Sequence, residues 1–366
     1  MGILCPELIF DIFPHLDLAG IKSLRLTCKQ YATIGLTYLL KHISVRFERG
    51  FAPIISIAEQ SEAAKKVRSL TYSRALLEPE FIPALLKSKI YNPKRKDRVR
   101  FQVDLNNESE RIIREDEDFT AFQNSFAKFR KLESINVICG APIDFEDYYL
   151  CRWSDKPRSN GVGVRELSAI QKAVLHARRK IKLLFVEHLD SKYFDQTTCQ
   201  VFGLAWAFVT TLDLRLIPNS DELWQQKVKG AVQQLVQLRE LHLRFCWCSE
   251  SGLTPLSSVL DWDFTWPNLA ALTLQGVVSD IQYFIESMET GLAKINCLTL
   301  SEFRFSVPDL QPILIYIRQR GLKKVNLLLW IESAEDLYED DGEQTLQQIV
   351  KWLLNPRLPW PLTDAD

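Results

Sequence analysis

The sequence lacks a long hydrophobic segment. Its longest apolar run, near Val201 to Val209, is far shorter than the roughly 20 residues that a helix needs to cross a bilayer. The N-terminal stretch carries Glu7 and Asp11 among its apolar residues and has no preceding lysine or arginine, which argues against a signal peptide. We therefore expect no membrane partner and a cytoplasmic or nuclear location.

An excess of charge of one sign is also missing. The chain has 45 Lys and Arg against 46 Asp and Glu, a formal net charge of −1, so no overall field attracts nucleic acid or an anionic membrane. The basic run from Lys94 to Arg100 is short and is followed by an acidic run from Glu108 to Asp118. We expect no nucleic-acid partner.

Paired cysteines and other signs of cofactor, metal or catalytic chemistry are absent. The eight cysteines are scattered without a C-x-x-C pair, as expected for reduced, mostly buried thiols. Gly161-Val162-Gly163-Val164 lacks the third glycine of a phosphate loop. His242 with Cys246 and Cys248 is the nearest approach to a zinc cluster, but an apolar patch beside one imidazole explains these residues better. We expect no cofactor, no metal and no catalytic residue.

The beginning of the chain carries the clearest functional pattern. Pro6 suits the first position of a helix, and Leu8, Ile9, Ile12, Phe13 and Leu16 follow it with helical spacing. Two further short apolar segments continue to Ile34. Three such short helices cannot cover this surface alone, and each aliphatic side chain left in water forgoes about 1.5–3 kcal/mol. Another surface should therefore cover it.

This region resembles an F-box, the motif by which a substrate receptor binds the Skp-family adaptor of a cullin–RING ubiquitin ligase. The matching elements are Pro6-Glu7-Leu8-Ile9, Ile12-Phe13, Leu16-Asp17-Leu18 and Leu24-Arg25-Leu26-Thr27-Cys28-Lys29, within residues 3–45. Cys5 and Tyr31 stand where the family usually has Leu and Trp. The alternative is a helical cap on the following domain. The resemblance implies adaptor contacts at Leu4, Pro6, Glu7, Leu8, Ile9, Ile12, Phe13, Leu16, Leu24 and Leu26.

After residue 65 one hexad recurs: apolar, two variable, apolar, one variable, apolar. Its central apolar residues from Leu184 to Val325 are 28, 29, 31, 26 and 27 residues apart, which indicates a repeat architecture. Apolar residues between the hexads follow the i, i+3, i+4, i+7 spacing of amphipathic helices, as in the stretches that begin at Ile281, Leu310 and Leu346. Each unit is therefore expected to be a strand followed by a helix that stacks on its neighbours.

The repeats resemble leucine-rich repeats of the longer, helix-bearing kind, although the Asn or Cys that usually turns the chain after the strand is mostly absent. We predict an α/β fold: an F-box-like domain over residues 1–45, then an irregular, curved leucine-rich-repeat solenoid with a parallel sheet over residues 46–366. Two longer intervals predict insertions near residues 76–128 and 139–178. Such insertions are either part of a binding face or tolerated surface loops.

The combination resembles the F-box/leucine-rich-repeat receptors. It implies a non-catalytic subunit of an SCF-type ubiquitin ligase that binds the Skp-family adaptor, and through it the cullin–RING ligase, and places an unknown target protein near the ubiquitin-charged enzyme. A leucine-rich-repeat scaffold or regulator without a role in ubiquitin transfer is the alternative. An enzyme with a site in one insertion has no supporting motif.

Equivalent hexad positions should form columns of side chains on the open face of the sheet. One column is Glu187, Arg215, Arg244, Gln275 and Ser301, and the next is Phe185, Asp213, His242, Thr273 and Thr299. Because the arginine fork suits carboxylate and phosphate groups, we predict substrate binding at Phe185, Glu187, Asp213, Arg215, His242, Arg244 and Gln275, with an acidic or phosphorylated segment across the two arginines. The alternative is that Asp213 and Glu187 neutralise the arginines as ordinary surface pairs.

Overall fold

Strands and helices alternate along this α/β chain. The computed structural model describes residues 12–47, 50–74, 111–139, 163–217, 223–245, 253–261, 263–305, 311–329, 349–355 and 358. Its contacts divide the chain into unit 1, residues 1–155 and 165–181, and unit 2, residues 156–164 and 182–366. Within the described ranges, no helix has both the length and the apolar character needed to cross a membrane.

Unit 1 begins with short helical elements that share a small apolar core. Phe13, Ile21 and Ile34 are buried together, and the ring of Phe13 stacks on that of Tyr38 at 5.3 Å. The Asp17 side chain caps the second element by accepting a hydrogen bond from the backbone N–H of Gly20 at 2.7 Å. These elements are η1 (Phe13–His15), α2 (Leu18–Arg25) and α3 (Lys29–Lys41).

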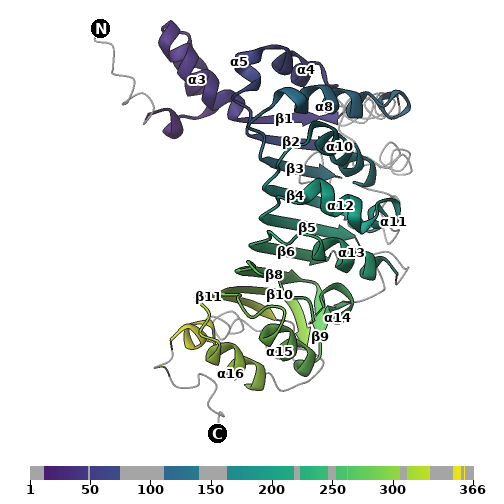
Figure 1. The fold of residues 1–366 in the computed structure, drawn as a ribbon. Helices are drawn as coiled ribbons and strands as arrows, with labels where there is room; N and C mark the ends of the chain where they lie inside the picture. The colour runs from purple at the N-terminus through teal and green to yellow at the C-terminus, as the bar shows by residue number, and fades with distance from the viewer. Residues whose placement is uncertain are drawn as a thin grey trace, which may run out of the picture. The chain divides into compact units, whose positions relative to one another are not determined.

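Three parallel strands follow in unit 1. Leu70 of β2 is paired with Ile43 of β1 on one side and with Ile135 of β3 on the other, and the strands lie side by side in Figure 1. The hexads after residue 65 predict the second and third strands but not the first, which continues directly from α3 and contains the predicted domain boundary at residue 45. The strands are β1 (His42–Arg46), β2 (Ser69–Arg74) and β3 (Ser134–Cys139).

Helices cover the apolar residues of these strands. Phe122 of α8 is the centre of an aromatic cluster, with ring centroids 4.8 Å from Tyr72, 5.4 Å from Phe51 and 5.5 Å from Phe126. Phe122, Phe126 and Phe129 are fully buried, whereas Phe119 of the same helix is only partly buried. The helices are α4 (Ala52–Glu59), α5 (Ser61–Ala64), α8 (Glu117–Lys128) and α10 (Val164–Ala177).

Unit 2 contains a longer parallel sheet. Its main strands pair in the order β4, β5, β6, β8, β10, β11, and two short strands, β9 and β7, continue from the far end of β10. Each main strand begins at the third residue of a predicted hexad. The strands are β4 (Leu183–Asp190), β5 (Thr211–Ile217), β6 (Glu240–Phe245), β7 (Thr254–Pro255), β8 (Ala271–Gln275), β9 (Val277–Ser279), β10 (Cys297–Phe305) and β11 (Lys324–Leu329).

One backbone carbonyl joins each repeat of unit 2 to the next. The second residue of a hexad accepts hydrogen bonds from the second and third residues of the following hexad: Thr210 accepts from Arg239 at 2.7 Å and from Glu240 at 3.0 Å. The same two-donor arrangement recurs at Lys182, Arg239, Ala270 and Asn296. The hexad is therefore the segment over which successive repeats are held in register.

The helices of unit 2 bury part of the apolar surface that the helical spacing predicts. Trp224 and Val228 of α13 are buried, and so are Phe284 and Met288 of α15. Of the last predicted stripe, Ile349 and Leu353 are buried and Val350 is partly buried in the helical residues 349–354. The helices are α11 (Tyr193–Gln196), α12 (Cys199–Trp206), α13 (Leu223–Gln233), α14 (Leu256–Val259), α15 (Ile281–Glu289) and α16 (Gln311–Gln319).

The two faces of this sheet differ in exposure. Leu212, Leu214 and Leu216 of β5 are fully buried, whereas the alternate residues are partly exposed. The same alternation holds in β6 and β8. Alternate residues of a strand point to opposite faces, so one face packs against the helices (Figure 1) and the other is open. The apolar hexad positions of these strands therefore belong to the core.

A left-handed residue recurs near the ends of three strands. His188, Gly276 and Glu302 have φ values of 57°, 73° and 49°, and each is the fourth residue after the central leucine of its hexad. The register shifts at the first and third of these positions, as at a β-bulge. Gly276 instead separates β8 from β9, where a Cβ atom would lie 2.6 Å from the backbone oxygen of Phe245.

Substitutions at two of these positions should have unequal effects. Gly276→Ala combines an unfavourable φ with a backbone clash, and we expect it to lower the free energy of unfolding by about 2–4 kcal/mol. Glu302→Gly relieves the unfavourable φ but increases the conformational entropy of the unfolded chain. Because these effects oppose each other, we expect the free energy of unfolding to change by less than about 1 kcal/mol. Urea denaturation of both variants measures this, and equal losses would contradict it.

Candidate functional site

The open face of the unit 2 sheet carries the polar columns that the sequence predicts. The strand register pairs Asp213 with His242, His242 with Thr273 and Thr273 with Thr299. The neighbouring column runs Arg215, Arg244, Gln275 and Ser301. The predicted columns are therefore confirmed as neighbours across the sheet, with Phe185 of β4 opposite Asp213.

Glu187 departs from its predicted column. The register of β4 against β5 shifts between Val186 and Leu189, so Glu187 lies in the bulge and has no partner directly across the sheet. Its carboxylate nevertheless reaches Arg215, with Oε1 3.3 Å from Nη1 of the guanidinium. The left-handed conformation of the next residue, His188, accompanies this bulge.

Both arginines of the site form ion pairs with the preceding strand. Arg215 of β5 pairs with Glu187 of β4, and Arg244 of β6 donates through Nη2 to Oδ2 of Asp213 on β5 at 2.8 Å. The two pairs form a diagonal series across the face, and their charges cancel. The geometry therefore agrees with the alternative in which Glu187 and Asp213 neutralise the two arginines. Substrate binding at these residues stays a prediction.

A histidine and a threonine extend the site toward β8. Nδ1 of His242 lies 2.8 Å from Oγ1 of Thr273, and Nε2 lies 4.0 Å from Oε2 of Glu240. Gln275 is the register neighbour of Arg244. The side chains of Phe185, His242, Arg244 and Gln275 are all partly exposed, so a molecule lying on this face would meet an apolar ring, two guanidinium groups and hydrogen-bonding side chains.

Burial sets the electrostatics of Asp213. Removal from water raises the pKa of the Asp213 carboxyl above its ordinary value of 3.8, and the neighbouring Arg244 and His242 oppose the rise. Its side chain is only 13% exposed, and Oδ1 is buried without a hydrogen-bond partner among the described residues. The folded chain therefore keeps this proton to higher pH than the unfolded chain does.

The stability of the protein should reflect this shift. Because the folded state binds more protons than the unfolded state between pH 3.8 and the raised pKa, the contribution of Asp213 to the unfolding free energy should fall as pH rises through that window. Asp213→Asn should remove this part of the slope. Urea denaturation of both proteins across the window measures the difference, and parallel curves would contradict the assignment.

The predicted adaptor-binding residues divide into three groups. Phe13 is fully buried in the N-terminal core, and Leu16 and Leu24 pack against it. Ile12 is 37% exposed and Leu26 is 89% exposed. Outside the described residues lie Leu4, Pro6, Glu7, Leu8 and Ile9. Of the described members, Leu26 and Ile12 thus present the most apolar surface to a partner.

Two features differ from or go beyond the predictions. Of the four cysteines in the described ranges, only Cys139 is buried, so the expectation of mostly buried thiols was wrong for this part of the chain. In unit 1, Arg165 and Glu166 of α10 form ion pairs with residues of α8 and β2, a gathering of charges that sequence reasoning missed. Within the described ranges there is no group of three or more His, Cys, Asp or Glu that could hold a metal ion.

No protein-family model matches the sequence, and no curated protein matches it. The functional conclusion therefore depends on the residues and the geometry described above.

Proposed function

We propose that the protein is a substrate-recognition subunit of an SCF-type ubiquitin ligase. Its N-terminal helices would bind the Skp-family adaptor, and the open face of the unit 2 sheet, as part of a leucine-rich-repeat-like solenoid, would bind the target protein. Such a subunit accelerates ubiquitin transfer by bringing the reactants together, so it needs no acid, base or nucleophile of its own.

The exposure of Leu26 carries the adaptor part of this proposal. This leucine follows α2, in the short connection to α3, and it is 89% exposed beside a core in which Phe13 is fully buried. An aliphatic side chain of this size gains about 1.5–3 kcal/mol when a partner removes it from water. Leu26 also belongs to the Leu-Arg-Leu-Thr-Cys-Lys segment that resembles the F-box. The exposed leucine and the resemblance therefore point to the same surface.

A substitution at Leu26 tests adaptor binding without disturbing the core. Leu26→Asp would place an unpaired carboxylate in the interface, and we expect it to weaken adaptor binding more than about 30-fold. The change should leave the melting temperature unaltered, because the side chain is exposed. Titration of purified adaptor against the full chain measures the affinity.

Leu204→Asp is the matched control, because Leu204 of α12 is another strongly exposed leucine, at 71%. It should leave adaptor binding unchanged. Absence of adaptor binding by the unmodified chain, or equal effects of the two variants, would refute the adaptor role.

The open face of unit 2 supports the substrate part of the proposal. Arg215 and Arg244 are only about one-third exposed and each is held by one carboxylate, so their positions are set before a substrate arrives. A phosphorylated or acidic segment would compete with Glu187 and Asp213 for the guanidinium groups of these arginines.

A double substitution tests substrate binding on this face. We expect Arg215→Glu combined with Arg244→Glu to abolish substrate capture and to leave adaptor binding unchanged. The control is Lys128→Glu combined with Lys172→Glu, at exposed helical positions, which should change neither.

One observation favours the alternative of a repeat scaffold without a role in ubiquitin transfer. Phe13, Ile21 and Ile34 already bury one face of the N-terminal helices inside unit 1, as a helical cap would. Under this alternative the chain would bind partner proteins but would not recruit a cullin–RING ligase. Failure of the adaptor titration together with retained partner binding would favour it.

A further inference from the structure

Two intervals of the chain that the structure does not describe follow neighbouring strands of unit 1. Residues 75–110 follow Arg74 at the end of β2 and lead to the residues before α8, and residues 140–162 follow β3 and lead to α10. β2 and β3 are parallel neighbours, so their carboxyl ends lie at the same edge of the sheet. The side chains that flank these segments can therefore interact with one another.

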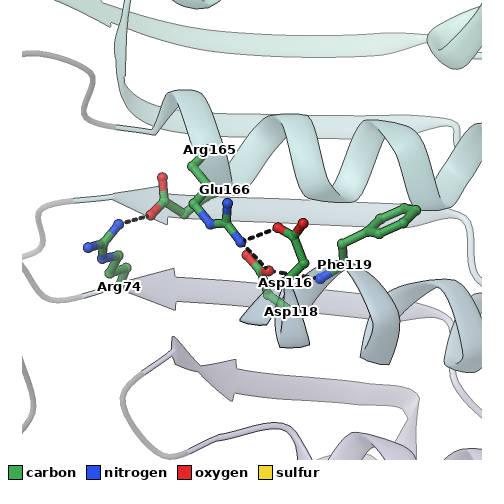
Figure 2. Close-up of polar contacts among 6 residues, drawn as sticks. All are labelled: Arg74, Asp116, Asp118, Phe119, Arg165 and Glu166. Atoms are coloured by element: carbon green, nitrogen blue, oxygen red, sulfur yellow. Dashed lines mark hydrogen bonds and ion pairs between the residues drawn. The ribbon is translucent and has the colours of Figure 1, made fainter. Parts of the chain in front are cut away.

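Two adjacent residues of α10 connect the neighbouring elements. Glu166 accepts a hydrogen bond from Nη1 of Arg74 on β2 at 2.6 Å. Nη2 of Arg165 lies 2.8 Å from Oδ1 of Asp118 in the first turn of α8, and 2.8 Å from Oδ1 of Asp116. Figure 2 shows the two side chains of α10 reaching in different directions, one to the strand and the other to α8.

Burial makes both connections expensive to open. The side chains of Glu166 and Asp118 are 2% and 0% exposed, and those of Arg74 and Arg165 are 16% and 29% exposed. A buried charge that loses its partner is not solvated by water, so breaking either ion pair destabilises the folded state. Arg74 is also held over the ring of Phe47, with its guanidinium carbon 4.7 Å from the ring centroid.

The connections also share one polar environment. The hydroxyl of Tyr72 is buried without a hydrogen-bond partner among the described residues. Burial, Glu166 and Asp118 together raise the pKa of the Tyr72 hydroxyl far above its ordinary value. Since both carboxylates act on the same hydroxyl, the Arg74–Glu166 and Arg165–Asp118 pairs lie close enough to influence one another electrostatically.

We propose that Arg74, Asp118, Arg165 and Glu166 form a coupling device that links the end of β2 to the first turns of α8 and α10. Because the two pairs originate from consecutive residues in one helical turn, release of one pair displaces the backbone that carries the other. A change that loosens the end of β2 is thereby transmitted to α8 and to the start of α10.

Hydrogen exchange in the full-length chain tests this coupling. Glu166→Gln keeps the side-chain shape and replaces the ion pair with Arg74 by a weaker, uncharged contact. We expect amide exchange to increase about 10-fold or more not only in the first turn of α10 but also at residues 116–119, which Glu166 does not contact in the described structure. Enhanced exchange confined to α10 and the end of β2 would overturn the proposal.

Two further variants separate coupling from general destabilisation. Ile54→Val trims a buried residue of α4 and should raise exchange across unit 1 without favouring residues 116–119. In a cycle of Glu166→Gln and Arg165→Met, the double variant should lose less in melting temperature than the two single losses combined. Additive losses would show two independent ion pairs and would also refute the coupling device.

Discussion

Replacement of Arg165 by leucine should lower the free energy of unfolding by about 3–5 kcal/mol. The guanidinium is the cation that contacts Asp118, whose side chain is fully buried in the first turn of α8. Leucine would leave that carboxylate unpaired in a site that water does not reach. Chemical denaturation at neutral pH, followed by circular dichroism, measures the loss.

The pH dependence of the same variant checks the cause. Burial already raises the pKa of Asp118 above its ordinary value, and Arg165 opposes that rise. Without the arginine the pKa should rise further, and the folded state should bind a proton that the unfolded chain releases. Stability of Arg165→Leu should then recover as the pH is lowered from neutral toward the raised pKa. A loss that does not depend on pH in this range would point to packing instead.

Asp118→Asn is the matched change on the other side of the pair. It removes the buried negative charge and keeps a side chain of similar size, while Arg165 retains its contact with the exposed Asp116. We therefore expect a much smaller loss than in Arg165→Leu. If the two variants were equally unstable, the contact itself and not the unpaired charge would carry the stabilisation.

Phe122→Ala should be comparably destabilising, by about 3–5 kcal/mol. The ring is fully buried and contacts the rings of Phe51, Tyr72 and Phe126, so its loss would leave a cavity between α4, α8 and β2. Phe119→Ala, one turn earlier on the same helix and only partly buried, should have a smaller effect. Denaturant titration of both variants measures the contrast, and equal losses would contradict it.

The strands of unit 2 could be predicted because their signal is local and repeated. In each hexad of unit 2 the three pattern-defining apolar residues are buried, and parallel pairing of hexads that share this pattern places equivalent residues side by side. The columns through Asp213 and Arg215 followed from this regularity alone. β1 was missed although Leu40-Lys41-His42-Ile43-Ser44-Val45 is a complete hexad, because the repeats were counted only after residue 65 and these residues were assigned to the end of the N-terminal helical domain.

The deviations from regularity could not be read from the sequence in the same way. Glu187 left its column because the following residue, His188, adopts a left-handed conformation that is usual for glycine. The ion pairs around α10 join residues that are distant in the sequence. Arg165 and Asp118 are 47 positions apart, and Arg74 and Glu166 are 92 positions apart. No pattern of local spacing connects such residues, and only the pairing of β2 with β3 brings their elements together.

In unit 2, a backbone carbonyl that accepts two hydrogen bonds from the next hexad determines where the chain could gain or lose residues. Register between repeats is fixed inside the hexad, where Thr210, Arg239 and Ala270 each receive two N–H groups from the next repeat. Residues gained or lost between a helix and the following hexad leave that pairing intact, as the varied intervals of 26 to 31 residues illustrate. One residue inserted within a hexad would turn every later side chain of that strand to the opposite face. Insertions and deletions should therefore be tolerated between the strands and selected against within them.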